Sequence, residues 1–108
     1  MKIDYLDKFS GTLLGVSIGD TLGQPFEGML WERIHSQFTD FKEFIKNNRR
    51  LFKTYTDDTQ LTLHTAEALI QGSGFNENNF VREYVKWLDD PPISPGFEIG
   101  RASCRERV

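Results

Sequence analysis

Apolar residues between positions 1 and 97 recur at the three- and four-residue spacing of an α-helix, and no stretch alternates with the two-residue period of a strand. The first helix is expected over residues 7–22. Four glycines recur at every fourth position and so share one face: Gly11, Gly15, Gly19 and Gly23. A glycine inside a helix costs about 1 kcal/mol relative to alanine. We therefore expect this glycine face to lie against a second helix, burying the first helix in an all-α core.

Two further helical segments follow. A loop with proline and glycine occupies residues 23–28, and residues 30–47 have a loose helical period with Thr39 or Asp40 as a cap. A clearer helix is expected over residues 56–72, where a glycine ends it. Its expected apolar stripe consists of Leu61, Thr65, Ala68 and Leu69.

The last helix is expected over residues 76–89, ahead of two prolines. Its expected apolar stripe consists of Phe80 or Val81, Tyr84, Val85 and Leu88. The opposite side, expected in solvent, carries Arg82, Glu83 and Lys86. The whole pattern predicts an all-α fold.

Composition narrows the class of protein. A chain of 108 residues forms at most one domain, and 38% hydrophobic residues with nine phenylalanines suffice for a core. The net charge of −3 gives no basic surface for nucleic acid and no polybasic segment for a membrane. The apolar stretch over residues 9–22 is too short to span a bilayer and contains Asp20. With no signal-like N-terminus and Cys104 as the single cysteine, we expect a cytoplasmic protein without disulfides.

Residues 99–108 differ in character from the rest of the chain. Three arginines fall within these ten residues without an apolar period. The segment resembles the in-frame translation of a common sequencing adapter, and an added segment of that kind carries no information about the fold. We therefore expect residues 98–108 to be a non-native tail, with Glu98 already affected, and residues 1–97 to be the N-terminal part of a larger domain.

Thr56, Asp57 and Asp58 form the sharpest candidate site. A hydroxyl and two carboxylates offer three oxygen ligands of the kind that hard cations such as Mg²⁺ prefer. At the entrance of a helix the backbone is not yet helical, so these oxygens can converge. The same residues also suit a plain helix cap with acids in the first turn. Asp20 and Glu27 would add carboxylates from a nearby loop.

Other polar and aromatic residues are interpreted as structural. His35 and His64 have no partner that the sequence identifies and are expected to be solvated or structural. Trp31 and Trp87 lie on helical segments and are expected to be packing residues. The acidic pair at residues 89–90 is expected to be a solvated helix end.

Two sequence blocks carry a family resemblance. Residues 9–27 read FSGTLLGVSIGDTLGQPFE, and residues 55–70 read YTDDTQLTLHTAEALI. In this order and spacing they resemble the opening of the ADP-ribosylglycohydrolase family. The expected helix over residues 76–89 and the turn at residues 95–97 also fall where that family has a helix and a glycine-aromatic loop. The resemblance implies a compact orthogonal helical domain, here truncated to its N-terminal helices.

The resemblance also implies a site, residue by residue. It makes Thr56, Asp57 and Asp58 the first ligand set of a dinuclear Mg²⁺ centre, for which Mn²⁺ is an alternative. It makes Glu27 the catalytic glutamate beside the metals and Asp20 a supporting group.

The match is looser further along the chain. Gly96 and Phe97 fall near the loop that cradles ADP-ribose in family members. The second metal-binding motif, an Asp-rich sequence near the family's C-terminus, is absent. We therefore expect this chain to be inactive on its own.

The activity that the resemblance implies is hydrolysis of the glycosidic bond between ADP-ribose and a modified protein side chain or small molecule. This cleavage passes through an oxocarbenium-like state, which paired cations and a positioned carboxylate would stabilise. Two alternatives stay open: a non-catalytic, lens-crystallin-like family member, and a structural or binding domain. The expected partner is the ADP-ribosylated substrate, without nucleic acid or membrane, and a monomer is favoured for the parent protein. The linkage and the target stay open.

If residues 99–108 are adapter translation, the gene read from independently prepared DNA will diverge at codon 98 and continue for roughly one or two hundred residues, a typical domain's length. The adapter would supply the last two bases of codon 98, so only its first base, G, belongs to the gene. The residue encoded there will then be Gly, Ala, Val, Asp or Glu. Finding the same ten residues and a stop codon in intact DNA would refute this expectation.

Overall fold

The computed structural model describes residues 2–90, and over that range it contains helices and no strand. The all-α prediction is confirmed, whereas the expected tail over residues 98–108 lies outside the described residues. In chain order the described elements are α1 (Tyr5–Gly23), the 3₁₀-helix η1 (Gln24–Phe26), α2 (Trp31–His35), α3 (Phe41–Asn47), the 3₁₀-helix η2 (Arg49–Leu51), α4 (Asp57–Gly72) and α5 (Glu77–Asp89).

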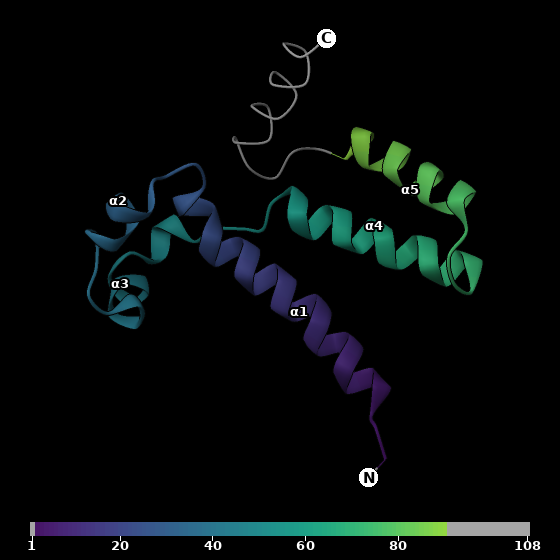
Figure 1. Ribbon diagram of the computed structural model, residues 1–108, viewed down its shortest axis with the longest axis horizontal. Coiled ribbons are helices and arrows are strands. Elements are labelled where there is room, and N and C mark those ends of the chain that lie inside the picture. The colour runs from purple at the N-terminus through teal and green to yellow at the C-terminus, as the bar shows by residue number, and fades with distance from the viewer. Residues whose placement is uncertain (1, 91–108) are drawn as a thin grey trace.

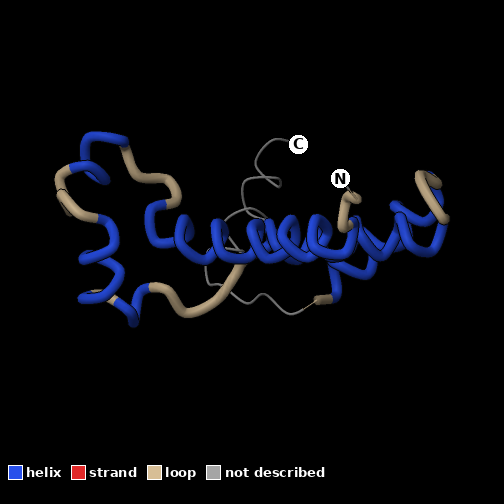
Figure 2. The backbone as a smooth tube through the Cα atoms, turned by 90° about the horizontal axis from the view of Figure 1, so that it is seen from below, coloured by secondary structure: helices blue, strands red, loops and turns tan. Residues whose placement is uncertain are grey.

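The three long helices, α1, α4 and α5, lie in one layer. α4 begins beside the C-terminal end of α1 and diverges from it, and α5 returns antiparallel along α4 (Figure 1). Seen at a right angle, the long helices overlap in one band, and the segment with α2 and α3 lies at one end of it (Figure 2). None of the described helices is both long and apolar enough to cross a membrane. The end of α1 and the start of α4 are thus where distant parts of the sequence meet.

Side-chain caps mark where α1, α3 and α5 begin, and the cap of α5 is Asn76, which accepts from the amide of Asn79 at 3.2 Å. Asp4 accepts a hydrogen bond from the amide of Asp7 at 3.2 Å, so α1 begins ahead of its predicted boundary. Asp40 accepts from the amide of Lys42 at 2.9 Å and from the amide of Glu43 at 3.3 Å. It is one of the two caps that the sequence indicated for this segment.

The predicted helix over residues 30–47 consists of two short helices, α2 and α3, separated by a turn. Five phenylalanine rings with centroid separations between 5.0 and 6.5 Å hold this part of the chain together: Phe26, Phe38, Phe41, Phe44 and Phe52. Trp31 was expected to pack, but its side chain is exposed and stacks on His35, one helical turn later, at a centroid distance of 4.8 Å.

α4 ends at Gly72, where the sequence predicts, and the packing of α5 against α4 explains why this position is a glycine. Ser73 takes the left-handed conformation after the helix, with a φ of 49°. A Cβ at position 72 would lie 3.0 Å from the side-chain nitrogen of Asn79 and 3.2 Å from the Cβ of Asn76. Gly72 therefore allows the start of α5 to approach α4 closely.

The glycine face of α1 has no helix against it in the described part of the chain, contrary to the prediction. A Cβ at any of its four glycines would meet no heavy atom within 4 Å. None of the residues of α1 is buried. The contacts that tie α4 to α1 come instead from the polar side chain of Asp20. The expected burial of this helix in an apolar core is therefore wrong for residues 2–90.

Few apolar side chains are buried in the described range. Ala68 is the single buried hydrophobic residue among residues 2–90, and the other buried side chains are polar: Thr56, Thr59, Gln60 and Glu83. The predicted apolar stripe of α4 is right for Ala68 and wrong for Leu69, which is exposed.

The predicted faces of α5 are right in part: Arg82 and Lys86 are exposed as expected and Phe80 is half-buried, but Glu83 is buried. Glu83, expected in solvent, is 2% exposed, whereas Val81, one of the expected core residues, is 57% exposed. Val85 and Leu88 are exposed as well. Three hydrogen-bonding partners on α4 and α5 satisfy the Glu83 carboxylate, which offsets the penalty of burying it.

We expect the chain to be helical but to unfold without a sharp transition, because large apolar side chains such as Phe9, Ile70 and Phe75 stay exposed. A thermal scan followed by circular dichroism should give a broad transition, and a dye specific for apolar surface should bind before unfolding. A sharp, reversible two-state melt with a high midpoint and no dye binding would contradict this expectation.

Candidate functional site at the junction of α1 and α4

The carboxylate of Asp20, on the last turn of α1, joins this helix to the start of α4. Its Oδ2 accepts hydrogen bonds from the amide of Thr56 at 2.7 Å, from the amide of Thr59 at 3.1 Å and from the hydroxyl of Thr59 at 2.6 Å. Its Oδ1 accepts from the hydroxyl of Thr56 at 2.5 Å. These contacts are termed the Asp20 bridge.

The Asp20 bridge is a helix cap supplied by a distant residue. Thr56 occupies the N-cap position of α4, but its side chain makes no capping bond: its hydroxyl donates to Asp20, and the amide of Thr59 also donates to Asp20. The hypothesis that the side chain of Thr56 caps this helix is therefore corrected. Asp20 satisfies the free amides in its place, and its negative charge suits the positive end of the helix dipole.

Hydrogen bonding keeps Asp20 ionised. Burial raises the pKa of Asp20, but the hydrogen bonds from Thr56 and Thr59 outweigh that effect and hold the pKa below its ordinary value of 3.8. Both threonines are buried, so water competes little for their donors. The Asp20 bridge is therefore intact at neutral pH.

A cleft of about 480 Å³ opens beside the Asp20 bridge and is termed the carboxylate cleft. It is lined by Val16, Gly19, Asp20, Gly23, Gln24, Phe26, Glu27 and Asp58. The three carboxylates come from α1, from the residue that follows η1 and from the first turn of α4. Because a Cβ at Gly19 or Gly23 would meet nothing within 4 Å, the missing side chains leave the space open. Part of the glycine face thus borders a cleft.

Acidic groups crowd this cleft. Burial raises the pKa of Asp58 above its ordinary value of 3.8, and the negative charges of Asp57 and Asp20 raise it further. None of the described residues that line the cleft is basic. Carboxylates this close repel each other until a cation or a proton neutralises them. The electrostatics of the cleft therefore favour a cation.

The structure brings together part of the predicted site. Asp20, Glu27 and Asp58 line one cleft, and Thr56 and Asp57 lie beside them at the start of α4 without lining it. Within residues 2–90, no group of three or more histidine, cysteine, aspartate or glutamate side chains is placed to hold a metal ion. The dinuclear metal centre stays a prediction. The residues predicted near ADP-ribose, Gly96 and Phe97, lie outside the described range.

Thr59 is the site residue that the sequence reasoning missed. It is buried and supplies two of the four hydrogen bonds to Asp20. The sequence feature that could have indicated Thr59 is its spacing from Thr56, because residues three apart on a helix lie on the same side. That spacing does not identify a partner 39 residues away in the sequence.

Replacing Asp20 by alanine should loosen the start of α4, because two buried threonine hydroxyls and two amides lose their acceptor. We expect a cost of about 2 kcal/mol, read as faster hydrogen exchange at the amides of Thr59 and Gln60. The contribution of Asp20 is present above pH 3.8 and is lost as the pH falls through its lower folded-state pKa. The exchange rates of the wild type and of Asp20→Ala should therefore converge in acid.

Asp7→Ala is the matched control, since Asp7 is an exposed acid on the same helix that donates only its backbone amide to a cap. It should leave the start of α4 unchanged. Equal effects of Asp7→Ala and Asp20→Ala, or a difference that persists in strong acid, would contradict the capping role of Asp20.

Comparison with known proteins identifies relatives. The ADP-ribosylglycohydrolase family model matches residues 1–107. A protein of Archaeoglobus fulgidus, described as uncharacterized, is 29% identical over 84 residues, which cover 76% of this chain and 28% of the relative. The ADP-ribosylhydrolase ARH3 of Xenopus tropicalis is 31% identical over 101 residues, which cover 87% of this chain and 27% of that protein.

The chain spans little more than a quarter of the length of these two curated relatives. No solved structure matches it significantly. The family match includes both sequence blocks that suggested the resemblance, at residues 9–27 and 55–70, and these blocks supply the Asp20 bridge and the carboxylate cleft. The resemblance is confirmed: the chain belongs to the ADP-ribosylglycohydrolase family.

Proposed function

We propose that the protein is a hydrolase that cleaves the glycosidic bond between ADP-ribose and a modified protein side chain or small molecule, with two Mg²⁺ ions in the complete catalytic domain. The observation that carries the proposal is the carboxylate cleft, in which Asp20, Glu27 and Asp58 converge from three separate segments. Family membership supports the hydrolase class. The similarity to a protein named ADP-ribosylhydrolase supports an ADP-ribosylated substrate.

Thr56, Asp57 and Asp58 would hold the cations. Their donors are all oxygens, which suits Mg²⁺ and, as an alternative, Mn²⁺. The hydroxyl of Thr56 gives its proton to Asp20, so its lone pairs stay available to a cation. The raised pKa of Asp58, caused by burial and then by the charges of Asp57 and Asp20, also fits a position beside a cation. The described residues do not complete the ligand set, and the remaining ligands would come from elsewhere in the protein.

When bound, the cations would supply Lewis-acid chemistry that neutralises the acidic cleft. Glu27 is exposed and lines the cleft, where it would face a bound substrate or water. In glycoside cleavage such a carboxyl group protonates the leaving atom or takes a proton from the attacking water. Gly19 and Gly23 leave room for the sugar, and Asp20 keeps the start of α4 in position.

The retained carboxylates favour an enzyme over the lens-crystallin-like or purely structural alternatives, since a structural domain has no need for three acids around one cleft. For the same chain we propose a cytoplasmic, monomeric parent protein whose partner is its ADP-ribosylated substrate. The acidic composition, with a net charge of −3, supports the absence of nucleic acid from this list of partners.

Asp57→Asn and Asp58→Asn should abolish ADP-ribose release while the fold without metal stays intact or gains stability, because each removes a negative charge from a crowded site. The alternative, in which both residues only compensate the helix dipole, predicts a loss of about 0.3–1 kcal/mol of stability and normal activity. The measurements are calorimetric Mg²⁺ titration and an ADP-ribose-release assay on the protein expressed from its complete gene.

Glu77→Gln is the matched control, because Glu77 is also an acid in the first turn of a helix but lies exposed on α5. It should reproduce any helix-dipole effect and leave Mg²⁺ binding and activity unchanged. Wild-type turnover in Asp57→Asn would return both aspartates to the role of first-turn acids and overturn the metal-site proposal.

A further inference from the structure

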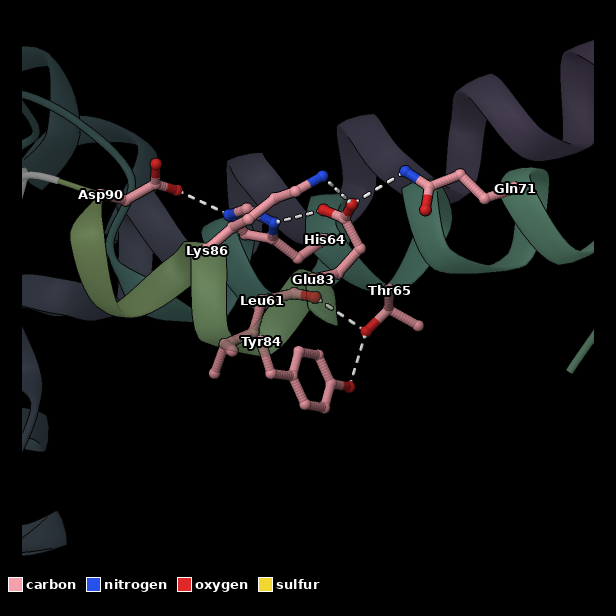
Figure 3. Close-up of polar contacts among 8 residues, drawn as sticks. All are labelled: Leu61, His64, Thr65, Gln71, Glu83, Tyr84, Lys86 and Asp90. Carbon is pink, nitrogen blue, oxygen red and sulfur yellow. Dashed lines mark hydrogen bonds and ion pairs between the residues drawn. The ribbon is translucent and has the colours of Figure 1, made fainter. Parts of the chain in front are cut away.

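The contact between α4 and α5 is made largely by polar and ionisable side chains. Figure 3 shows His64 and Gln71 of α4 meeting Glu83 and Lys86 of α5, with Asp90 just beyond the end of that helix. These five residues are termed the His64 cluster. The apolar side of α5 points away from this contact, since Val81, Val85 and Leu88 are exposed. Hydrogen bonds between polar and ionisable side chains therefore hold α5 against α4 in this region.

The imidazole of His64 lies between two carboxylates. Its Nδ1 is 3.0 Å from Oε2 of Glu83, and its Nε2 is 2.6 Å from Oδ2 of Asp90 (Figure 3). The other oxygen of Glu83 accepts hydrogen bonds from Gln71 at 2.8 Å and from Lys86 at 2.5 Å. Both ring nitrogens of His64 thus face a carboxylate oxygen.

Such an arrangement requires a proton on each ring nitrogen. An ionised carboxylate only accepts hydrogen bonds, and a neutral imidazole has one N–H and one lone pair. The protonated ring donates to Glu83 and to Asp90 at once. After loss of a proton, one nitrogen presents its lone pair to a carboxylate oxygen, and that contact becomes repulsive. Only the imidazolium form therefore satisfies both contacts.

We infer that His64 is a proton-operated latch: in its protonated form it holds both Glu83 and Asp90 and closes α5 onto α4, and loss of the proton releases the C-terminal end of α5. The inference is independent of the proposed hydrolase activity, because none of the residues of the His64 cluster lines the carboxylate cleft.

Exposure decides which contact breaks. The side chain of Glu83 is 3% exposed and keeps its bonds to Gln71 and Lys86, whereas the side chain of Asp90 is 42% exposed and can turn into water. The neutral ring therefore keeps its proton on Nδ1, facing Glu83, and the contact with Asp90 opens.

The N-terminal half of α5 stays attached by contacts that do not involve His64. The hydroxyls of Thr65 and Tyr84 are 2.9 Å apart, and the start of α5 packs closely on Gly72. The opening is therefore a movement of one helix end about a fixed start.

The charges around the His64 ring favour its protonated form. Burial lowers the pKa of His64, but Asp90 and Glu83 raise it more, so the pKa lies above its ordinary value of 6.5. Hydrogen bonds from Lys86, His64 and Gln71 lower the pKa of Glu83 to about 2. Among the described residues, no ionisable group of α1 contributes to the pKa of His64. With two cations and two anions the cluster is neutral, and loss of the proton leaves it at −1.

The pH range over which the latch is closed follows from the directions in which the pKa values of His64 and Glu83 are shifted. A group whose pKa is raised by folding stabilises the closed form below its ordinary pKa, and the effect is lost as the pH rises through the folded-state pKa. For His64 the latch is therefore closed below pH 6.5 and opens as the pH rises through the higher folded-state pKa. For Glu83 the contribution is present above pH 4.5 and is lost as the pH falls toward about 2.

The test is amide hydrogen exchange along α5 between about pH 5 and about pH 9, corrected for the pH dependence of intrinsic exchange. In the wild type, protection of the last turn of α5 should fall about tenfold as His64 deprotonates, the effect of one charged hydrogen bond. The first turn of α5 and the whole of α3 should not change. Nitrogen NMR shifts of the ring should report both nitrogens protonated in the closed form and a proton on Nδ1 in the open form.

Asp90→Asn and Asp89→Asn form a matched pair, since they remove the same charge one residue apart and Asp89 is exposed. Asp90→Asn should abolish the pH-dependent step in protection, and Asp89→Asn should retain it. Wild-type protection that does not change with pH, or a step that Asp89→Asn removes as fully as Asp90→Asn, would overturn the latch. A ring that stays neutral at about pH 6 would overturn it without any variant.

Discussion

The four hydrogen bonds that Thr56 and Thr59 donate to Asp20 determine where α4 begins relative to α1. Hydrogen bonds to an ionised acceptor are shorter and stronger than those between neutral groups. Because Ala68 is the one buried hydrophobic residue among residues 2–90, these polar contacts matter all the more for the helix arrangement. Asp58, which lines the cleft, lies in the helix turn that Asp20 holds.

Both helix junctions follow the same principle. α1 meets α4 through a carboxylate and two threonines, and α4 meets α5 through a histidine between two carboxylates. Satisfied polar networks fix one geometry, because a shift of either helix leaves a buried group without its partner. The two junctions differ in their response to pH. The one charged group of the first junction, Asp20, stays ionised at neutral pH, whereas the second junction contains His64, which can lose its proton there.

The features that local sequence determines could be predicted, and those that depend on distant partners could not. Helical spacing and the cap at Asp40 gave the all-α class and most helix boundaries. The prediction for α5 was wrong at Glu83, because a glutamate is expected in solvent until its three partners are known. Asp20, Glu27 and Asp58 were identified from their carboxylate chemistry and assigned roles by the family resemblance, whereas Thr59 was missed because its partner lies on another helix.

The segment of residues 24–55 connects the two helices that the Asp20 bridge joins. It contains the five clustered phenylalanine rings described above. Closing such a loop costs only about 0.6 kcal/mol more when its length doubles. Residues 28–55 supply none of the described residues that line the cleft, so insertions and deletions there need not move Asp20, Glu27 or Asp58. The length of this loop and the position of the three acids are thus set by separate parts of the chain.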